Sequence, residues 1–130
     1  MTISEMSNAE LDRLIAERRG WEYSARGFEV HIGSGLRFPY KNKITGKFDV
    51  RYPSFTTDPR YAMELLKEMA EHHVILSYEK NWNLMPDDQN MYWIVHFPLW
   101  LNFTRIQRIL TYADTPERAI SEAWLTVERK

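Results

Sequence analysis

The sequence predicts an α+β protein in which a mostly antiparallel sheet is layered against helices. Three helix-start signals are each followed by apolar residues at helical spacing. Short segments rich in β-branched and aromatic residues lie between them. Short turns separate neighbouring segments of this kind, and strands joined in this way pair antiparallel. The expected order is α-β-β-(β)-α-β-β-β-α, in one domain over residues 1–130.

The first helix is expected from Asn8 to about Arg19. Ser7 and Glu10 have the spacing of a capping box, in which a hydroxyl and a carboxylate satisfy the free N–H groups of the first turn. Gly20 is expected to end the helix because glycine adopts the left-handed conformation of a C-terminal cap. The apolar stripe of this helix comprises Leu11, Leu14 and Ile15.

A β-hairpin is expected directly after this helix. Residues 21–24 and 28–32 alternate apolar and polar side chains, and Arg26-Gly27 supplies a turn between them. Residues 33–57 are expected to be irregular because glycine and proline interrupt them repeatedly. Only residues 48–52 within that stretch have the pattern of a short strand.

The second helix is expected to begin with Asp58 as its N-cap and Pro59 as its first residue, and to end near His72-His73. A strand over residues 74–79 and a polar, acidic hairpin loop over residues 81–90 should follow. The buried stripe of the helix is expected to comprise Ala62, Leu65, Leu66, Met69 and His73.

In the last third of the sequence, the residue pattern predicts two strands and a helix. Residues 91–97 are apolar on both alternating faces, so both faces should be covered. Pro98 should end this strand or place a bulge in it. Residues 103–112 predict the next strand, although Ile109 breaks their alternation. Thr115 caps a final helix over Pro116–Glu128, whose expected stripe comprises Ala119, Ile120, Ala123, Trp124 and Val127.

Composition excludes several classes of protein. The chain contains no cysteine, so disulfides, cysteine-based zinc sites and cysteine nucleophiles are absent, and a reducing cytoplasm is expected. Its start, Met1–Met6, is polar and lacks the basic and apolar regions of a secretory signal. No apolar run reaches the ~20 residues that cross a membrane. The net charge of −1 creates no overall attraction to nucleic acid or anionic lipid.

Several segments resemble the phage ABA sandwich domain family: Leu11–Glu17 with Gly20-Trp21, Pro53–Asp58, and Ala113–Ile120. Members of this family are small phage and prophage proteins that layer one antiparallel sheet against helices. The resemblance does not extend over residues 33–52 or 98–105. It implies a phage accessory protein working in the cytoplasm of a bacterial host. The family has no assigned chemistry, so it implies no catalytic residue.

The basic and aromatic residues between Arg37 and Phe55 form the most suggestive candidate site. Five basic side chains face a single acid, Asp49, and aromatic side chains alternate with them. Basic groups bind phosphates, and aromatic rings stack on bases or fill pockets on a protein partner. Ordinary strands with solvated lysines show the same pattern. The candidate partner-binding residues are Arg37, Phe38, Tyr40, Lys41, Lys43, Lys47, Arg51, Trp82 and Trp100.

No catalytic, metal or cofactor site is predicted. The four histidines lack the His-x-x-x-His spacing of metal-binding helices. Gly33-Ser34-Gly35 lacks the remaining residues of a phosphate-binding loop and is expected to be a simple turn. Asp87-Asp88, with Glu79 nearby, could act as acid–base partners, but their polar loop shows no sign of burial, and a solvated loop is the default interpretation. A Ser or Thr nucleophile has no accompanying motif.

Three functions remain open. The first is a non-enzymatic phage accessory protein that binds a bacterial protein and inhibits a host defence. The second is a nucleic-acid- or nucleotide-binding module that uses residues 37–55. The third is an enzyme, for which the sequence offers no positive support. An open sheet edge would also allow a homodimer.

Overall fold

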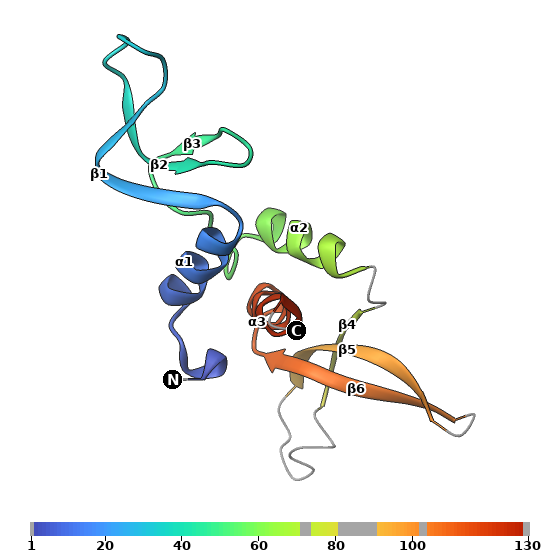
Figure 1. Ribbon diagram of the computed structural model, residues 1–130. Helices are drawn as coiled ribbons and strands as arrows, with labels where there is room; N and C mark the ends of the chain where they lie inside the picture. Colours follow the sequence, from blue (N-terminus) through green and yellow to red (C-terminus); the bar gives the residue numbers. More distant parts are fainter. Residues whose placement is uncertain (1, 71–73, 81–90, 102–103, 129–130) are drawn as a thin grey trace.

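The computed structural model describes residues 2–70, 74–80, 91–101 and 104–128, and it confirms the α+β class (Figure 1). The six strands of these described residues form two antiparallel three-stranded sheets, with orders β1-β2-β3 and β4-β5-β6. The helices are α1 (Asn8–Arg18), α2 (Pro59–Met69) and α3 (Pro116–Glu128), after a short 3-10 turn at Ile3–Glu5. The strands are β1 (Trp21–Glu29), β2 (Arg37–Asn42), β3 (Phe48–Asp49), β4 (Ile75–Lys80), β5 (Met91–Leu101) and β6 (Thr104–Ala113).

Each helix begins at the cap that the sequence predicts. Ser7 Oγ accepts a hydrogen bond from the Glu10 N–H at 3.1 Å. Asp58 Oδ1 accepts from the Arg60 N–H at 2.9 Å, and Thr115 Oγ1 accepts from the Arg118 N–H at 3.2 Å. These bonds satisfy N–H groups that have no partner within the helix.

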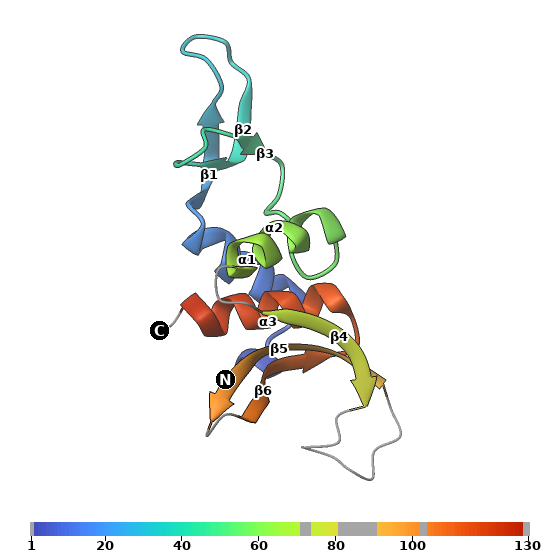
Figure 2. The ribbon, with the colours of Figure 1, turned by 90° about the vertical axis from the view of Figure 1, so that its right-hand side faces the viewer.

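The body, comprising the three helices and the sheet β4-β5-β6, holds the core. Helix α3 lies between α1 and α2 on one side and the sheet on the other (Figure 2). The predicted stripe of α3 is buried, with Val127 partly so, and Ser121, Glu122 and Leu125 on the other side are buried as well. A helix covered all round is rarer than the amphipathic helix that a stripe predicts. The stripes of α1 and α2 are also buried, with Leu14 and Leu66 partly exposed and His73 outside the described residues.

Strand β5 is the central strand of the body sheet, and both its faces are covered at residues 94–96, as predicted, whereas Met91 at its start is exposed. Trp93 and Val95 pack toward the helical core, while Ile94 and His96, on the opposite face, are buried too. The expectation that Pro98 ends the strand or bulges it is wrong. The ladder runs on to Leu101, and its register shift lies between Val95 and His96.

The reason Pro98 is tolerated lies in the neighbouring strand. Among the described residues, β4 pairs with β5 only as far as the partners Ile75 and His96, and the partner of Pro98 is Gln107 of β6 alone. A proline lacks an N–H, and it costs little where that side of the strand has no partner.

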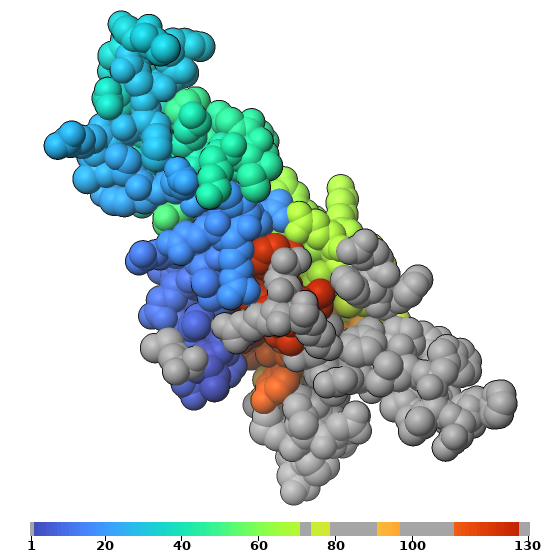
Figure 3. Space-filling model, viewed as in Figure 1, coloured from blue at the N-terminus to red at the C-terminus, as the bar shows by residue number. Residues whose placement is uncertain are grey.

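The arm, residues 21–53, contains the other sheet and projects from the body at the end of α1 (Figures 1 and 3). The predicted hairpin with a turn at Arg26-Gly27 is wrong, because β1 runs unbroken through both residues. The register passes from the pair Tyr23–Tyr40 to the pair Phe28–Phe38, so four residues of β1 oppose Pro39 alone. This is a large bulge, and Gly27 adopts the positive φ of +78° within it.

The expectation that residues 33–57 are irregular is also wrong, because they contain β2. This strand tolerates Pro39 because β3 pairs only with Tyr40 and Lys41. The proline therefore lies where β2 has no β3 partner, opposite the bulge of β1. The strand expected at residues 48–52 is shorter than predicted and ends at Asp49.

Candidate functional site

The arm is joined to the body by a polar turn around Asn42. This buried side chain donates to the carbonyl of Arg19 at 3.2 Å and accepts from the N–H groups of Ile44 and Thr45 at 2.8 and 3.1 Å. The Lys43 N–H donates to the Gly20 carbonyl at 2.9 Å. Asn42 thus fixes both the turn between β2 and β3 and its position against the end of α1.

Most aromatic side chains of the arm contact one another. The Tyr40 ring lies 5.1 Å from Tyr23 and 4.4 Å from Tyr52 between centroids, and Phe38 lies 6.2 Å from Phe48. These tilted pairs stabilise a small sheet that has no helix of its own to cover it. These contacts leave the rings less accessible for stacking on a nucleic-acid base, although Tyr23 is still exposed.

Phe55 belongs to the body and not to the predicted basic and aromatic surface. Its side chain is fully buried, its ring packs edge-on against Tyr61, and its carbonyl accepts from the Ser121 hydroxyl at 3.0 Å. The neighbouring Thr56 N–H donates to Asp12 Oδ1 at 2.9 Å. Burial raises the pKa of the Asp12 carboxyl, although this bond opposes the rise. Phe55 and Thr56, within the segment Pro53–Asp58 on which the family prediction rests, therefore serve the fold.

The basic side chains of the arm fall into two groups. Some are already engaged: Arg37 pairs with Glu29 at 3.3 Å, Lys43 lies 3.6 Å from Glu22, and Lys41 lies over the Phe48 ring. Within the described part of the chain, no ion pair involves the exposed side chains of Arg26, Lys47 or Arg51.

Charge is distributed unevenly between the arm and the remaining chain. Residues 21–53 contain six Lys and Arg against three Asp and Glu, a net charge of +3. The whole chain has a net charge of −1, so the residues outside the arm carry −4. The arm is thus a positive lobe on a negative protein, and it would favour a partner surface of negative charge.

Exposed apolar side chains gather on the same lobe. Eight large apolar side chains of the described residues are exposed, and five of them belong to the arm, which is about a quarter of the chain. Ile32, at the tip, is fully exposed. Apolar side chains that share one lobe with cations form the kind of surface that protein partners cover. The five are Tyr23, Ile32, Leu36, Ile44 and Val50.

The structure brings seven of the nine predicted site residues into one lobe. Arg37, Phe38, Tyr40, Lys41, Lys43, Lys47 and Arg51 all lie in the arm. Trp82 lies outside the described residues. Trp100 lies near the end of β5 in the body sheet, not in a loop, so it does not join this lobe.

Sequence reasoning missed the exposed apolar residues of the arm. It treated residues 28–32 as a strand, Gly33-Ser34-Gly35 as a simple turn and Leu36 as part of an irregular stretch, so Ile32 and Leu36 received no attention. Their signal was local: the two aliphatic side chains flank the glycines of Gly33-Ser34-Gly35. A turn of this composition has no core of its own in which to bury them.

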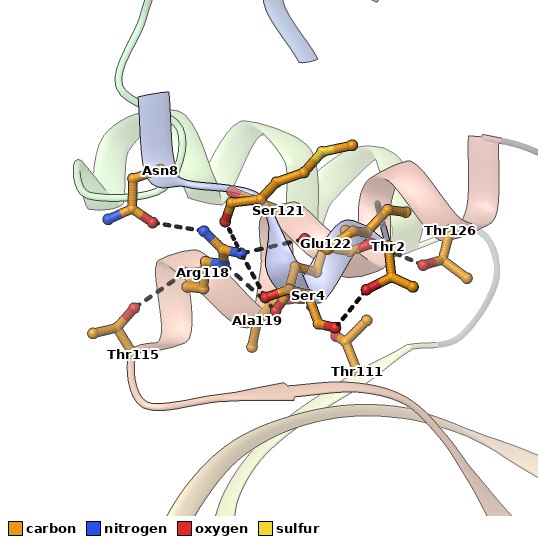
Figure 4. A network of polar contacts seen from close by, with 12 residues as sticks. Thr2, Ser4, Asn8, Thr111, Thr115, Arg118, Ala119, Ser121, Glu122 and Thr126 are labelled. Atoms are coloured by element: carbon orange, nitrogen blue, oxygen red, sulfur yellow. Dashed lines mark hydrogen bonds and ion pairs between the residues drawn. The ribbon is translucent and has the colours of Figure 1, made fainter. Parts of the chain in front are cut away.

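A second cluster of charged residues lies inside the body around Arg118 (Figure 4). Its guanidinium donates to the carbonyls of Ile3 and Met6 at 3.3 and 2.6 Å and to Asn8 Oδ1 at 2.8 Å. It also lies 3.7 Å from the buried Glu122 carboxylate. Burial raises the pKa of Glu122, and the positive charge of Arg118 partly offsets this. Because these contacts are made to the N-terminal segment, the cluster anchors that segment to α3.

The described residues offer little to bind a metal. They contain no group of three or more His, Asp or Glu side chains that could hold one. His96 and Ser77, on adjacent strands of the body sheet, approach to 3.1 Å between Nε2 and Oγ, and His96 Nδ1 is buried without a hydrogen-bond partner among the described residues. A carboxylate at Nδ1 would be needed to orient a catalytic imidazole. Asp87 and Asp88, considered as acid–base partners, lie outside the described residues.

Comparison with known proteins adds no relationship: no protein-family model, no curated protein and no solved structure matches this chain. The resemblance to the phage ABA sandwich family therefore stays a prediction. None of the described helices is both long and apolar enough to cross a membrane.

Proposed function

We propose that this protein acts by non-covalent binding, as a phage or prophage accessory protein whose arm docks on a protein of the bacterial host. The observation that carries the proposal is the coincidence of five exposed apolar side chains and a net charge of +3 on one projecting lobe. Protein interfaces combine apolar side chains with complementary charge in this way. The bacterial host and inhibition of a host defence follow from the family resemblance alone, and the absence of cysteine also fits a reducing cytoplasm.

Affinity purification with the immobilised full chain tests this proposal. Lysate of a bacterial host is passed over the wild type, over a double variant Lys47→Glu/Arg51→Glu, and over the control Arg18→Glu/Lys67→Glu. The control reverses the same number of exposed charges on α1 and α2. We expect the wild type and the control to retain the same protein at stoichiometric level, and the arm variant to retain at least tenfold less. Equal retention by all three, or none by the wild type, contradicts the proposal.

Nucleic-acid binding is the second candidate, favoured by the exposed cations Lys47 and Arg51 and by the partly exposed ring of Tyr23. It requires an affinity that falls steeply as salt rises. The triple variant Lys41→Ala/Lys43→Ala/Lys47→Ala should then abolish binding of a single-stranded oligonucleotide, measured by fluorescence anisotropy. Retention of the host protein that disappears after nuclease treatment of the lysate would favour this candidate over the first.

A further inference from the structure

The loop that joins β1 to β2 is built around hydrogen bonds of its own. The Val30 N–H donates to the Leu36 carbonyl at 2.9 Å, which closes the loop. Ser34 Oγ accepts from the N–H groups of His31 and Leu36 at 3.4 and 3.3 Å, and the Ser34 N–H donates to the His31 carbonyl at 2.9 Å. The tip therefore has a defined shape before any partner binds, although it lies far from the core (Figure 1).

This defined shape presents aliphatic side chains to solvent. Ile32 has a relative exposure of 106% and buries no surface within the protein itself, whereas Leu36, at 55%, is only partly covered. Burial of an isoleucine side chain in a partner strengthens binding about 10- to 100-fold. Because the loop is already ordered, little of that gain is lost to conformational entropy on binding. Ile32 thus has the position and preorganisation of an anchor residue.

The charged side chains near the tip indicate which charges a partner surface that receives Ile32 would carry. Arg26 is exposed and makes no ion pair among the described residues. Arg37 pairs with Glu29 and also donates to the carbonyls of Arg26 and Gly27, at 2.9 and 3.4 Å. With Lys47 and Arg51 further back, the lobe remains positive overall. Acidic side chains at the rim of the pocket would complement it.

Two other classes of binding partner, membranes and single-stranded nucleic acid, fit the arm less well. Membrane surfaces select uninterrupted clusters of 4–8 Lys and Arg and aromatic side chains at the interface, whereas the arm mixes three acids with its cations and has aliphatic side chains at its tip. Single-stranded nucleic acid needs free ring faces, and the rings of Tyr40 and Phe38 already contact other rings of the arm.

We infer that the tip of the β1–β2 loop is a preformed anchor, and that Ile32 enters an apolar, acid-rimmed pocket on the host protein. This inference rests on the proposed function and adds to it the contact point and the chemistry of the partner.

The test begins by mapping which part of the full chain contacts the partner. The photo-crosslinking amino acid benzoylphenylalanine replaces Ile32, or, as a control, the exposed Met63 of α2. Each protein is irradiated in host lysate. We expect a crosslink from position 32 and none from position 63, with the crosslinked peptide placing apolar and acidic residues at the contact. Crosslinking from position 63 alone overturns the inference.

Affinities measured with the crosslinked partner, once purified, complete the test. Ile32→Ala should weaken binding at least tenfold and Met63→Ala less than twofold, with unchanged thermal unfolding in both. Ser34→Ala removes no apolar contact, yet it should weaken binding several-fold, with faster amide exchange at residues 31–36, because it releases the tip. A partner that binds the wild type and Ile32→Ala equally overturns the anchor and leaves the proposed function standing. Failure to retain any partner overturns both.

Vesicles of phosphatidylserine and phosphatidylcholine serve as the competing probe. Cosedimentation of the wild type with these vesicles, lost in Ile32→Ala, would assign the tip to membranes and overturn the inference. We expect the wild type and the variant to remain in the supernatant alike.

Discussion

The body and the arm of this protein treat large apolar side chains in opposite ways. In the body, α3 lies between two helices and a sheet, and consecutive residues from Ala119 to Leu125 are buried. In the arm, Trp21, Tyr40 and Tyr52 reach the core at the joint with the body, other aromatic rings contact one another, and aliphatic side chains remain in solvent. The comparison teaches that most of the stability of the protein comes from the body. Residues of the arm can therefore be suited to contact with a partner at little cost to the free energy of unfolding.

The largest loss of unfolding free energy is expected from Trp124→Ala in the body. The Trp124 side chain is buried in the core, and its indole N–H donates to Glu68 Oε2 at 2.7 Å. Its truncation should cost about 3–5 kcal/mol, which is much of the stability of a typical domain. Urea unfolding measures the loss. Tyr23→Ala, the matched aromatic change on the arm, should cost about 1 kcal/mol or less, and equal costs would contradict the division between body and arm.

Replacement of Arg118 by methionine should have the next largest effect. It leaves the Glu122 carboxylate buried without its ion-pair partner and frees the carbonyls of the N-terminal segment. A loss of about 3 kcal/mol is expected, because removal of one partner from a buried pair is costly. Amide exchange at residues 3–8 should also accelerate. The control Arg13→Met breaks an exposed pair with Glu17 and should cost about 0.5 kcal/mol or less.

The joint between body and arm is tested by Gly20→Ala. Gly20 adopts a φ of +99°, and an added Cβ would lie 2.8 Å from Ile44 Cδ1 and 3.0 Å from Asn42 Oδ1. The conformational strain alone costs about 1–2 kcal/mol, and the crowding should add to it. Gly46→Ala has a similar φ of +77° but meets no atom within 4 Å, so it isolates the strain. Equal thermal shifts in the two variants would show that the joint tolerates the extra methyl group.

The pH dependence of unfolding tests the buried carboxylate of the body. Burial raises the pKa of Glu122 above its ordinary value of 4.5, so the folded state binds the proton more tightly than the unfolded state. The stability that this group contributes therefore grows as pH falls toward 4.5 and is lost as pH rises through the raised value. The stability of the wild type relative to Glu122→Gln should accordingly increase between pH 7 and pH 4.5. Parallel profiles would contradict the assignment.

Asp58 provides a control of opposite sign. Its hydrogen bonds with Arg60 lower the pKa of its carboxyl below 3.8. Stabilisation by this group is therefore present at neutral pH and is lost only as pH falls below about 3.8. Asp58→Asn should leave the profile between pH 7 and pH 4.5 unchanged.

The smallest effect on stability is expected at the tip of the arm. Ile32→Ser removes a side chain that contacts nothing in the free protein, so its unfolding free energy should stay within about 0.5 kcal/mol of the wild type. Thermal unfolding checks this. A larger loss would mean that the tip supports the fold, and Ile32 would then not be available as an anchor.

Local features of the sequence determined the fold class and the residue at which each helix begins. The end of α2 was predicted wrongly, because the helix stops at Met69 and not near His72-His73. Ser7, Asp58 and Thr115 act through hydrogen bonds to N–H groups two or three residues away, so their effect can be predicted from a short window. The apolar stripes of the helices are equally local. For the candidate site, the sequence located seven of the arm residues by composition, but it did not reveal which of them were already paired.

The tertiary structure alone decided how the strands are divided between two sheets and where the arm points. Strand pairing joins residues that are distant in the chain, and a bulge such as the one before Phe28 depends on the partner strand as much as on the bulged one. The same non-local reason explains α3: its stripe predicts one buried face, whereas Ser121 and Glu122 are buried only because other elements close over them. Ile32 shows the converse, since nothing in the described part of the chain covers its side chain.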